Sequence, residues 1–179
     1  MGSGFRFKCN NCGGEYTVLL GVGFAFPSEY EKVNEDVKHG EYGEEWKTLI
    51  NSEEFIQADA EKYFFHCGGC GYWKEDYGLS LYAPNNVESL RKKQYGIKTV
   101  EEWGYVPYAI FGKTLIGNTN PDFHILKKRI HRCPECNRAM KKHTYEQLLK
   151  RLYNDDSFTI KCPKCGEKLE VEGGAIRWD

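Results

Sequence analysis

Residues 160–169 of this 179-residue chain read "IKCPKCGEKL", in which two residues separate Cys162 from Cys165 and a glycine follows the second cysteine. The same spacing recurs three times earlier in the chain, so that all eight cysteines fall into C-x-x-C pairs. This spacing is typical of metal sites rather than of a disulfide framework. The other three pairs lie in "FKCNNCGGEY" from residue 7, "FHCGGCGYW" from residue 65 and "HRCPECNRAM" from residue 131.

The residue after each second cysteine supports the metal interpretation. In a metal knuckle (the tight turn that carries a C-x-x-C pair), the residue after the second cysteine usually has a positive φ angle. Glycine and asparagine tolerate this angle best. All four pairs have such a residue, namely Gly13, Gly71, Asn137 and Gly166. A thioredoxin-like dithiol would instead precede a helix, whereas the "GYW" after the second pair predicts a strand. The pairs are therefore predicted to be metal ligands rather than redox dithiols.

Distance along the chain suggests which pairs share a metal. Short connections that do not thread one another are preferred, so neighbouring pairs are expected to combine. Four thiolates in a tetrahedral array suit Zn²⁺ and leave no open coordination position, which predicts two structural zinc ions per chain. Iron fits the same ligands and leaves rubredoxin-like electron transfer as an alternative. The predicted sites are Cys9, Cys12, Cys67 and Cys70, and Cys133, Cys136, Cys162 and Cys165.

At these knuckles the chain resembles the zinc-ribbon, rubredoxin-like class, in which two knuckles lie on facing β-hairpins and C-P-x-C-G is the commonest knuckle sequence. "CPKCG" (162–166) is the clearest match, "CPEC" (133–136) is good, and "CNNCG" and "CGGCG" lack the proline. The chain also resembles small bacterial proteins that carry two such ribbons. The resemblance implies a fold, but ribbons serve many functions and the fold does not choose among them.

The predicted fold class is α+β, with two zinc-ribbon-like β units. The first unit, 1–83, is interrupted by an acidic helical insert at about 27–62, in which "EYEKVNEDVKHG" follows an N-cap at Ser28 and "EEWKTLI" and "EEFIQADAEKYF" continue in helical style. Residues 84–122 are predicted to be a linker with irregular strands. The second unit, 123–179, is interrupted by one short helix that Thr144 caps. Alternating residues predict strands at "FRFKC" and "EYTVLL" around the first knuckle, a further strand is predicted at "SFTIKC" before the fourth, and Gly40 is predicted to end the first helix.

Charge is distributed unevenly although the net charge is only −1. Residues 127–151 are strongly basic and residues 29–62 are strongly acidic. The basic segment can contact nucleic-acid phosphates, but balance of the thiolate charge together with a solvated face is preferred. For the cations that lie farther from the thiolates, docking on the acidic insert is preferred over nucleic-acid contact. The candidate contact residues, for nucleic acid or another partner, are Lys127, Lys128, Arg129, Lys141 and Lys142.

Other side chains receive structural interpretations. The dense aromatic residues between 72 and 123 are expected to be core rather than stacking platforms for bases. His66 and His131 lie beside ligand cysteines and are expected to support the ligands rather than to coordinate the metal. Asp155 and Asp156 are expected to form the turn that ends the preceding helix. No catalytic motif is recognisable, so the sequence does not decide whether the protein is an enzyme, and a non-enzymatic role is preferred.

No apolar run reaches the roughly 20 residues of a membrane span, and no export signal precedes the first knuckle. Paired cysteines without an export signal favour a reducing compartment, so a cytoplasmic location is expected. The sequence thus predicts a cytoplasmic protein with two structural metal sites that presents rigid surfaces to a macromolecular partner, a protein rather than a nucleic acid.

Overall fold

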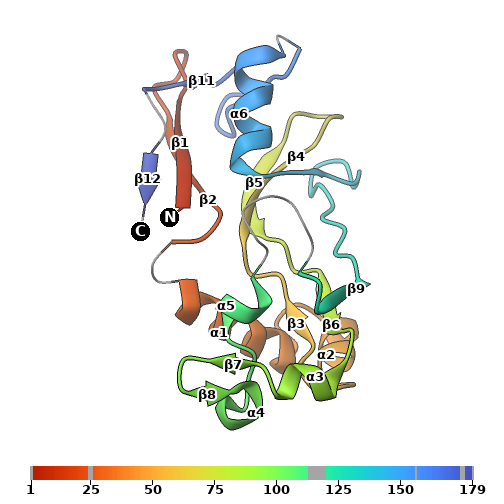
Figure 1. Ribbon diagram of the computed structural model, residues 1–179. Helices are drawn as coiled ribbons and strands as arrows, with labels where there is room; N and C mark the ends of the chain where they lie inside the picture. The colour runs from red at the N-terminus through yellow and green to blue at the C-terminus, as the bar shows by residue number, and fades with distance from the viewer. Residues whose placement is uncertain (1, 24–25, 113–119, 156, 174–175, 179) are drawn as a thin grey trace. The chain divides into compact units, whose positions relative to one another are not determined.

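The computed structural model describes residues 2–23, 26–112, 120–155, 157–173 and 176–178. Helices and small antiparallel sheets alternate along the chain, which confirms the α+β class (Figure 1). The chain divides into two compact units, each built from separate segments. Unit 1 comprises residues 1–25, 61–77 and 130–179, and unit 2 comprises 26–60 and 78–129. Among the described residues, no helix is long and apolar enough to cross a membrane.

One sheet of unit 1 is organised around its first strand, β1 (Gly2–Lys8). β1 pairs antiparallel with β2 (Glu15–Leu20) over its whole length, and the first cysteine knuckle joins the two strands. On its other edge β1 pairs with β11 (Glu170–Val171) and β12 (Ile176–Trp178), which come from the opposite end of the chain (Figure 1). The expected strands "FRFKC" and "EYTVLL" are confirmed.

The second sheet of unit 1 has the order β10–β4–β5 and comprises β4 (Lys62–His66), β5 (Trp73–Tyr77) and β10 (Lys141–His143). The chain continues from β10 into α6 (Tyr145–Asn154), as predicted. Thr144 caps this helix in a capping box with Gln147, which satisfies backbone N–H groups that the first turn leaves unpaired. Asp155 ends the helix, as expected.

Aromatic side chains supply much of the core of unit 1. Phe5, Phe7 and Phe64 are almost fully buried and pack with Leu148 from α6. Trp73 stacks on Phe64 with ring centroids 5.4 Å apart. The Trp73 indole also donates a hydrogen bond of 2.8 Å to the backbone oxygen of Lys161, so it ties the start of β5 to the residue before the fourth knuckle.

Unit 2 packs helices on a small sheet. The helices α1 (Phe26–His39) and α2 (Glu44–Ile50) contact each other, and the sheet has the order β3–β6–β9, with β3 (Gln57–Ala58), β6 (Leu81–Pro84) and β9 (Phe123–Lys127). Tyr30 of α1 is buried, and its hydroxyl donates a 2.6 Å hydrogen bond to Gln57 of β3. Gly40 follows α1 with a φ of 96°, as its predicted position after the helix requires.

The segment predicted to be a linker is mostly folded into unit 2, apart from residues 113–119, which lie outside the described part of the chain. Its buried side chains include Leu90, Val100 and Val106. Phe111 packs against Tyr30, with ring centroids 5.6 Å apart. The regular elements of the segment are α3 (Val87–Arg91), β7 (Gln94–Tyr95), β8 (Lys98–Thr99), α4 (Val100–Trp103) and α5 (Tyr108–Phe111).

Three expectations differ from the structure. "EEFIQADAEKYF" is not helical, because residues 56–60 are buried and contribute β3, and β4 then begins at Lys62. "SFTIKC" forms no strand, only an isolated bridge between Lys161 and Lys168. The two compact units do not follow the expected boundaries near residues 83 and 122, because unit 1 combines residues from both ends of the chain and unit 2 combines residues 26–60 with 78–129.

Candidate metal centres

The cysteines of unit 1 gather into two groups of four. Within each group the sulfur atoms all lie within 4.8 Å of one another. The pairing that chain distance predicts is therefore wrong: the first knuckle joins the fourth, and the second joins the third. Quartet 1 is Cys9, Cys12, Cys162 and Cys165, and quartet 2 is Cys67, Cys70, Cys133 and Cys136.

Strand pairing accounts for this nested arrangement. Lys8, just before the first knuckle, pairs with Glu170, just after the fourth. In the same way His66 precedes the second knuckle and pairs with Lys141, which follows the third. Joining the first knuckle to the fourth closes a loop of residues 13–161, whereas joining it to the second would close a loop of residues 13–66. The longer loop is roughly three times as long, and the additional loop-closure entropy costs only about 1 kcal/mol. Two short strand ladders offset such a cost easily.

The four knuckles share one backbone geometry. The carbonyl of each first cysteine accepts a hydrogen bond of 2.8 or 2.9 Å from the N–H four residues later. That fourth residue has a positive φ in every case, as the sequence predicts: 69° at Gly13, 78° at Gly71, 58° at Asn137 and 78° at Gly166. Any larger side chain at these positions would be strained, which explains why only glycine and asparagine occur there.

The sulfur positions fit a single metal ion in each quartet. In quartet 1 the sulfurs of Cys9 and Cys165 lie 3.4 Å apart and those of Cys12 and Cys162 3.6 Å apart. In quartet 2 the distances Cys67–Cys136 and Cys70–Cys133 are both 3.4 Å. All eight thiols are free, since a disulfide would need about 2.0 Å. A tetrahedral ion with bonds of about 2.3 Å to sulfur would separate its ligands by about 3.8 Å, close to the observed spacing.

One thiol in each quartet is predisposed to ionise. The backbone N–H groups of Cys70 and Gly69 lower the pKa of Cys67 to about 6. Burial raises the pKa of Cys162, but donation from the Tyr16 hydroxyl, at 3.2 Å, and from backbone N–H groups outweighs it and lowers that pKa to about 6. Sequence reasoning did not identify Tyr16, because nothing in its spacing from the cysteines marks it as a donor.

Two other thiols, Cys12 and Cys70, resist ionisation because they are desolvated and their neighbours are also sulfur atoms. The backbone N–H of Gly14 lowers the pKa of Cys12, but burial and the adjacent thiols outweigh this effect and raise that pKa to about 11. The backbone N–H of Tyr72 lowers the pKa of Cys70 in the same way, but the thiol of Cys133 and burial outweigh it and raise the pKa of Cys70 to about 12. A dication at the centre of a quartet would offset this repulsion and favour four thiolates, so both quartets suit metal binding.

The two histidines beside the knuckles have structural partners. The ring of His131 stacks on Phe65 with centroids 3.8 Å apart, and its Nδ1 lies 3.5 Å from Asp76. Burial acts against ionisation of Asp76, but His131 and Lys74 outweigh it and lower its pKa to about 2. His66 donates from Nε2 to the backbone oxygen of Thr159 at 3.1 Å. Neither histidine belongs to a cysteine quartet.

The predicted contact residues divide between the two units. Lys127 lies 2.9 Å from Glu45, and the guanidinium of Arg129 lies 4.6 Å from the ring centroid of Trp46, both contacts within unit 2. In unit 1 the ammonium of Lys142 lies 4.0 Å from the ring centroid of Tyr63. Lys128 and Lys141 are exposed. The basic segment therefore does not form a single surface within either unit.

Comparisons with family models, curated proteins and solved structures find no match to this chain.

We predict that double cysteine variants will reveal the pairing through their metal content. Replacing Cys9 and Cys162 by serine removes ligands from quartet 1 alone, so the chain should keep the metal of quartet 2. Replacing Cys9 and Cys67 damages both quartets, so the chain should lose both ions. Metal analysis of the purified variants distinguishes the two results. Equal losses in the two variants would contradict the nested pairing.

A second prediction concerns His143, whose ring is 7 % exposed and packs near His66 and Phe158. Burial is the main cause that lowers the pKa of His143 from 6.5 to about 4, and the charges of His66, Arg151 and Lys141 act in the same direction. The unfolded chain therefore binds the proton more readily than the folded chain. The stability that this group contributes is complete above about pH 6.5 and is lost as the pH falls towards 4.

When the pH is lowered from about 7.5 to about 5.5, the unfolding free energy of the parent protein should fall. We expect this fall to be about 1 kcal/mol larger than in the variant His143→Gln. Denaturant titration of both proteins at each pH measures the difference, and the loss of metal on acidification affects both alike. Parallel stability curves would show that His143 is not buried in its neutral form.

Proposed function

We propose that this protein binds two Zn²⁺ ions in closed, structural, zinc-ribbon-like sites and acts as a non-enzymatic interaction module. The observation that carries the proposal is the convergence of four cysteine sulfurs, from two knuckles, in each quartet. Such a set uses every coordination position of a tetrahedral ion and leaves none for substrate or water. The metals then serve to stabilise unit 1, since binding free energy contributes directly to folding.

The surroundings of the quartets support a structural role. Cys9 and Cys162 belong to the main hydrophobic core of unit 1, beside Phe7 and Leu169. Cys67 and Cys133 belong to a smaller cluster that includes Phe65 and Met140. An ion at each centre would therefore cross-link core residues from distant parts of the chain, which a unit with short strands needs.

The surface of unit 2 favours a protein as the partner. Ile97 stands at the tip of the β7–β8 hairpin and is 90 % exposed, and Tyr95 of the same hairpin is also exposed. Exposed aliphatic and aromatic side chains close together mark protein contacts more often than nucleic-acid contacts. Within the same unit, Lys127 and Arg129 contact Glu45 and Trp46, so they are partly engaged already.

We predict that protein purified without added metal will contain two zinc ions per chain, one for each quartet. A strong chelator should remove both and cause cooperative unfolding of unit 1, because the thiolates then repel each other in its core. Elemental analysis and circular dichroism measure the two effects. A red, iron-containing protein would instead support the electron-transfer alternative, and a metal-free chain with unchanged stability would contradict a structural role.

We also predict that replacing Lys127, Lys128 and Arg129 together by glutamate will lower thermal stability, because the change sets negative charges beside Glu45 and removes the contact of Arg129 with Trp46. The parent should bind neither generic single-stranded nor double-stranded nucleic acid at low salt. Lys150→Glu, an exposed change on α6, is the matched control for added negative charge. Unchanged stability together with lost nucleic-acid binding would favour the nucleic-acid function instead.

A further inference from the structure

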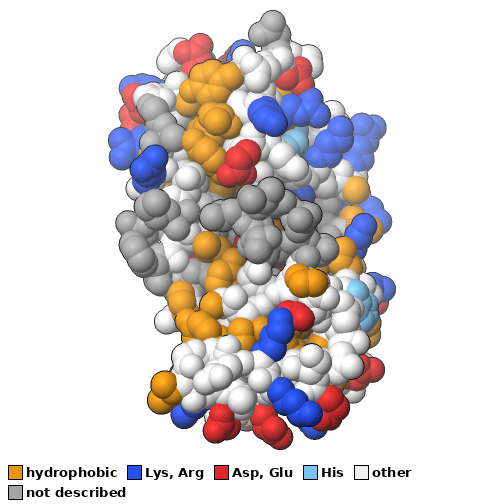
Figure 2. All heavy atoms as spheres, viewed as in Figure 1, with side chains coloured by type: hydrophobic (Ala, Val, Ile, Leu, Met, Phe, Trp, Pro, Cys, Tyr) orange, Lys and Arg blue, Asp and Glu red, His pale blue; other side chains and the backbone are white. Residues whose placement is uncertain are grey.

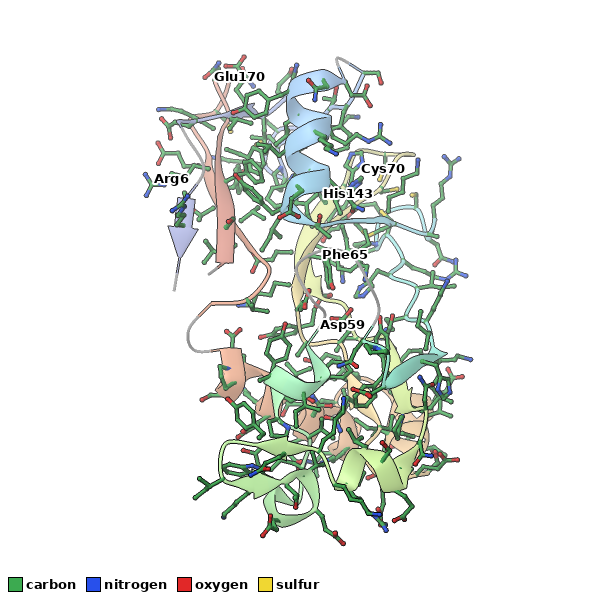
Figure 3. All side chains as sticks on the ribbon, viewed as in Figure 1. Arg6, Asp59, Phe65, Cys70, His143 and Glu170 are labelled. Atoms are coloured by element: carbon green, nitrogen blue, oxygen red, sulfur yellow. The ribbon has the colours of Figure 1, made fainter. Side chains whose placement is uncertain are left out.

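Unit 1 contains a cavity of about 320 Å³ beside quartet 2, which none of the roles above uses. Its walls come from the second knuckle, from Lys141 and His143 of β10, from Arg151 of α6 and from the segment that leads to Lys161. Figure 3 shows the labelled Cys70 and His143 in this part of unit 1. The volume lies at the lower end of the range for small-molecule sites and suits one compact polar group.

Positive charge dominates the walls. Lys141, Arg151 and Lys161 line the cavity, against a single described carboxylate, Asp155. Asp155 is already bound by Arg151 and by the hydroxyl of Ser157. Among the described residues, neither Lys141 nor Lys161 has an ion pair. Figure 2 shows Lys and Arg side chains (blue), with a histidine (pale blue) among them, on the face of unit 1 near α6.

The charge of a metal-bound quartet does not account for these lysines. A zinc ion with four thiolates carries a net charge of −2. Two arginines already lie at quartet 2: Arg132 donates to the backbone oxygen of Asn137 at 3.0 Å, and a Cβ added to Gly69 would lie 2.6 Å from Arg138. These two cations offset the quartet, which leaves the ammonium groups of Lys141 and Lys161 for another anion.

Packing fixes the position of the cavity's donors. Phe158 packs against the rings of both His66 and His143, with centroids 4.8 and 5.7 Å apart, and the guanidinium of Arg151 lies 5.8 Å from its centroid. The stem of Lys161 crosses the second knuckle so closely that a Cβ on Gly71 would lie 2.8 Å from its Cδ. Donors held in place before binding lose less entropy when a ligand arrives.

His143 provides an observation that is independent of the charge. Its Nε2 is buried and has no hydrogen-bond partner among the described residues. A buried polar atom without a partner is costly and rare, and it calls for an explanation such as a ligand. An anion bound in this cavity would lie beside His143 and the two lysines and would supply the acceptor that the ring lacks.

We propose that this cavity binds a phosphate group, held by Lys141, Lys161 and Arg151 and by a hydrogen bond from His143. The group belongs either to a small phosphomonoester or to the terminal phosphate of an oligonucleotide, because both offer the same oxygens. The site is distinct from the surface of unit 2 proposed for a protein partner. It depends on the fold of unit 1 but on no open coordination position of either metal.

The test titrates inorganic phosphate into the full, metal-loaded chain and follows amide NMR shifts. Residues that line the cavity should shift in a saturable way. Lys141→Gln should weaken the apparent affinity about tenfold, the effect of one lost charge-assisted hydrogen bond. Lys141 is exposed and forms no ion pair with any residue that the structure describes, so this variant should fold and keep both metals. Lys150→Gln, on α6 but outside the cavity, is the matched control and should bind phosphate like the parent.

A second arm compares a short oligonucleotide with and without a 5′-phosphate. Preference for the phosphorylated form would support a phosphomonoester, and equal binding of both forms would contradict it and assign the cavity to a nucleic-acid backbone instead. Three further results would overturn the proposal: no saturable shift at the cavity, equal weakening in Lys141→Gln and Lys150→Gln, or loss of metal from Lys141→Gln without an effect on phosphate. The last result would show that Lys141 only balances the thiolates.

Discussion

Four sulfur atoms can share one metal only if two knuckles meet face to face, and this constraint shapes the whole of unit 1. In each quartet, the strand that enters one knuckle pairs with the residues that leave the other: Lys8 with Glu170, and His66 with Lys141. The two ladders place the knuckles opposite each other. A bound metal would join the facing knuckles, whose sulfurs lie 3.4–3.6 Å apart in the pairs Cys9–Cys165, Cys12–Cys162, Cys67–Cys136 and Cys70–Cys133.

Nesting one quartet inside the other explains why the units are discontinuous. Residues 26–60 lie between the first and second knuckles, and residues 78–129 lie between the second and third. Both excursions contribute to unit 2, which has its own sheet and its own aromatic core around Tyr30 and Phe111. Unit 1 therefore closes only when the last 50 residues, 130–179, meet the first 25. A metal held by cysteines from both ends would favour this long-range closure.

Local features of the fold could be predicted from the sequence because their physics is local. Positive φ after each knuckle, the cap at Thr144 and the alternation of "FRFKC" each depend on a few neighbouring residues. The pairing of the knuckles could not be predicted, since loop length affects closure only weakly and the β1–β11 ladder leaves no mark in the spacing. "EEFIQADAEKYF" has helical composition, but burial of residues 56–60 in unit 2 overrides that propensity. His143 and Tyr16 gained their importance only from contacts across the chain.

The nested arrangement can be tested directly by loading the chain with an NMR-active cadmium isotope. Scalar coupling from each cadmium to the β-protons of its cysteines identifies the ligands of each ion without any mutation. The account predicts two cadmium signals. One should correlate with Cys9, Cys12, Cys162 and Cys165, and the other with Cys67, Cys70, Cys133 and Cys136. A signal that correlates with Cys9 and Cys67 together would contradict the nested arrangement.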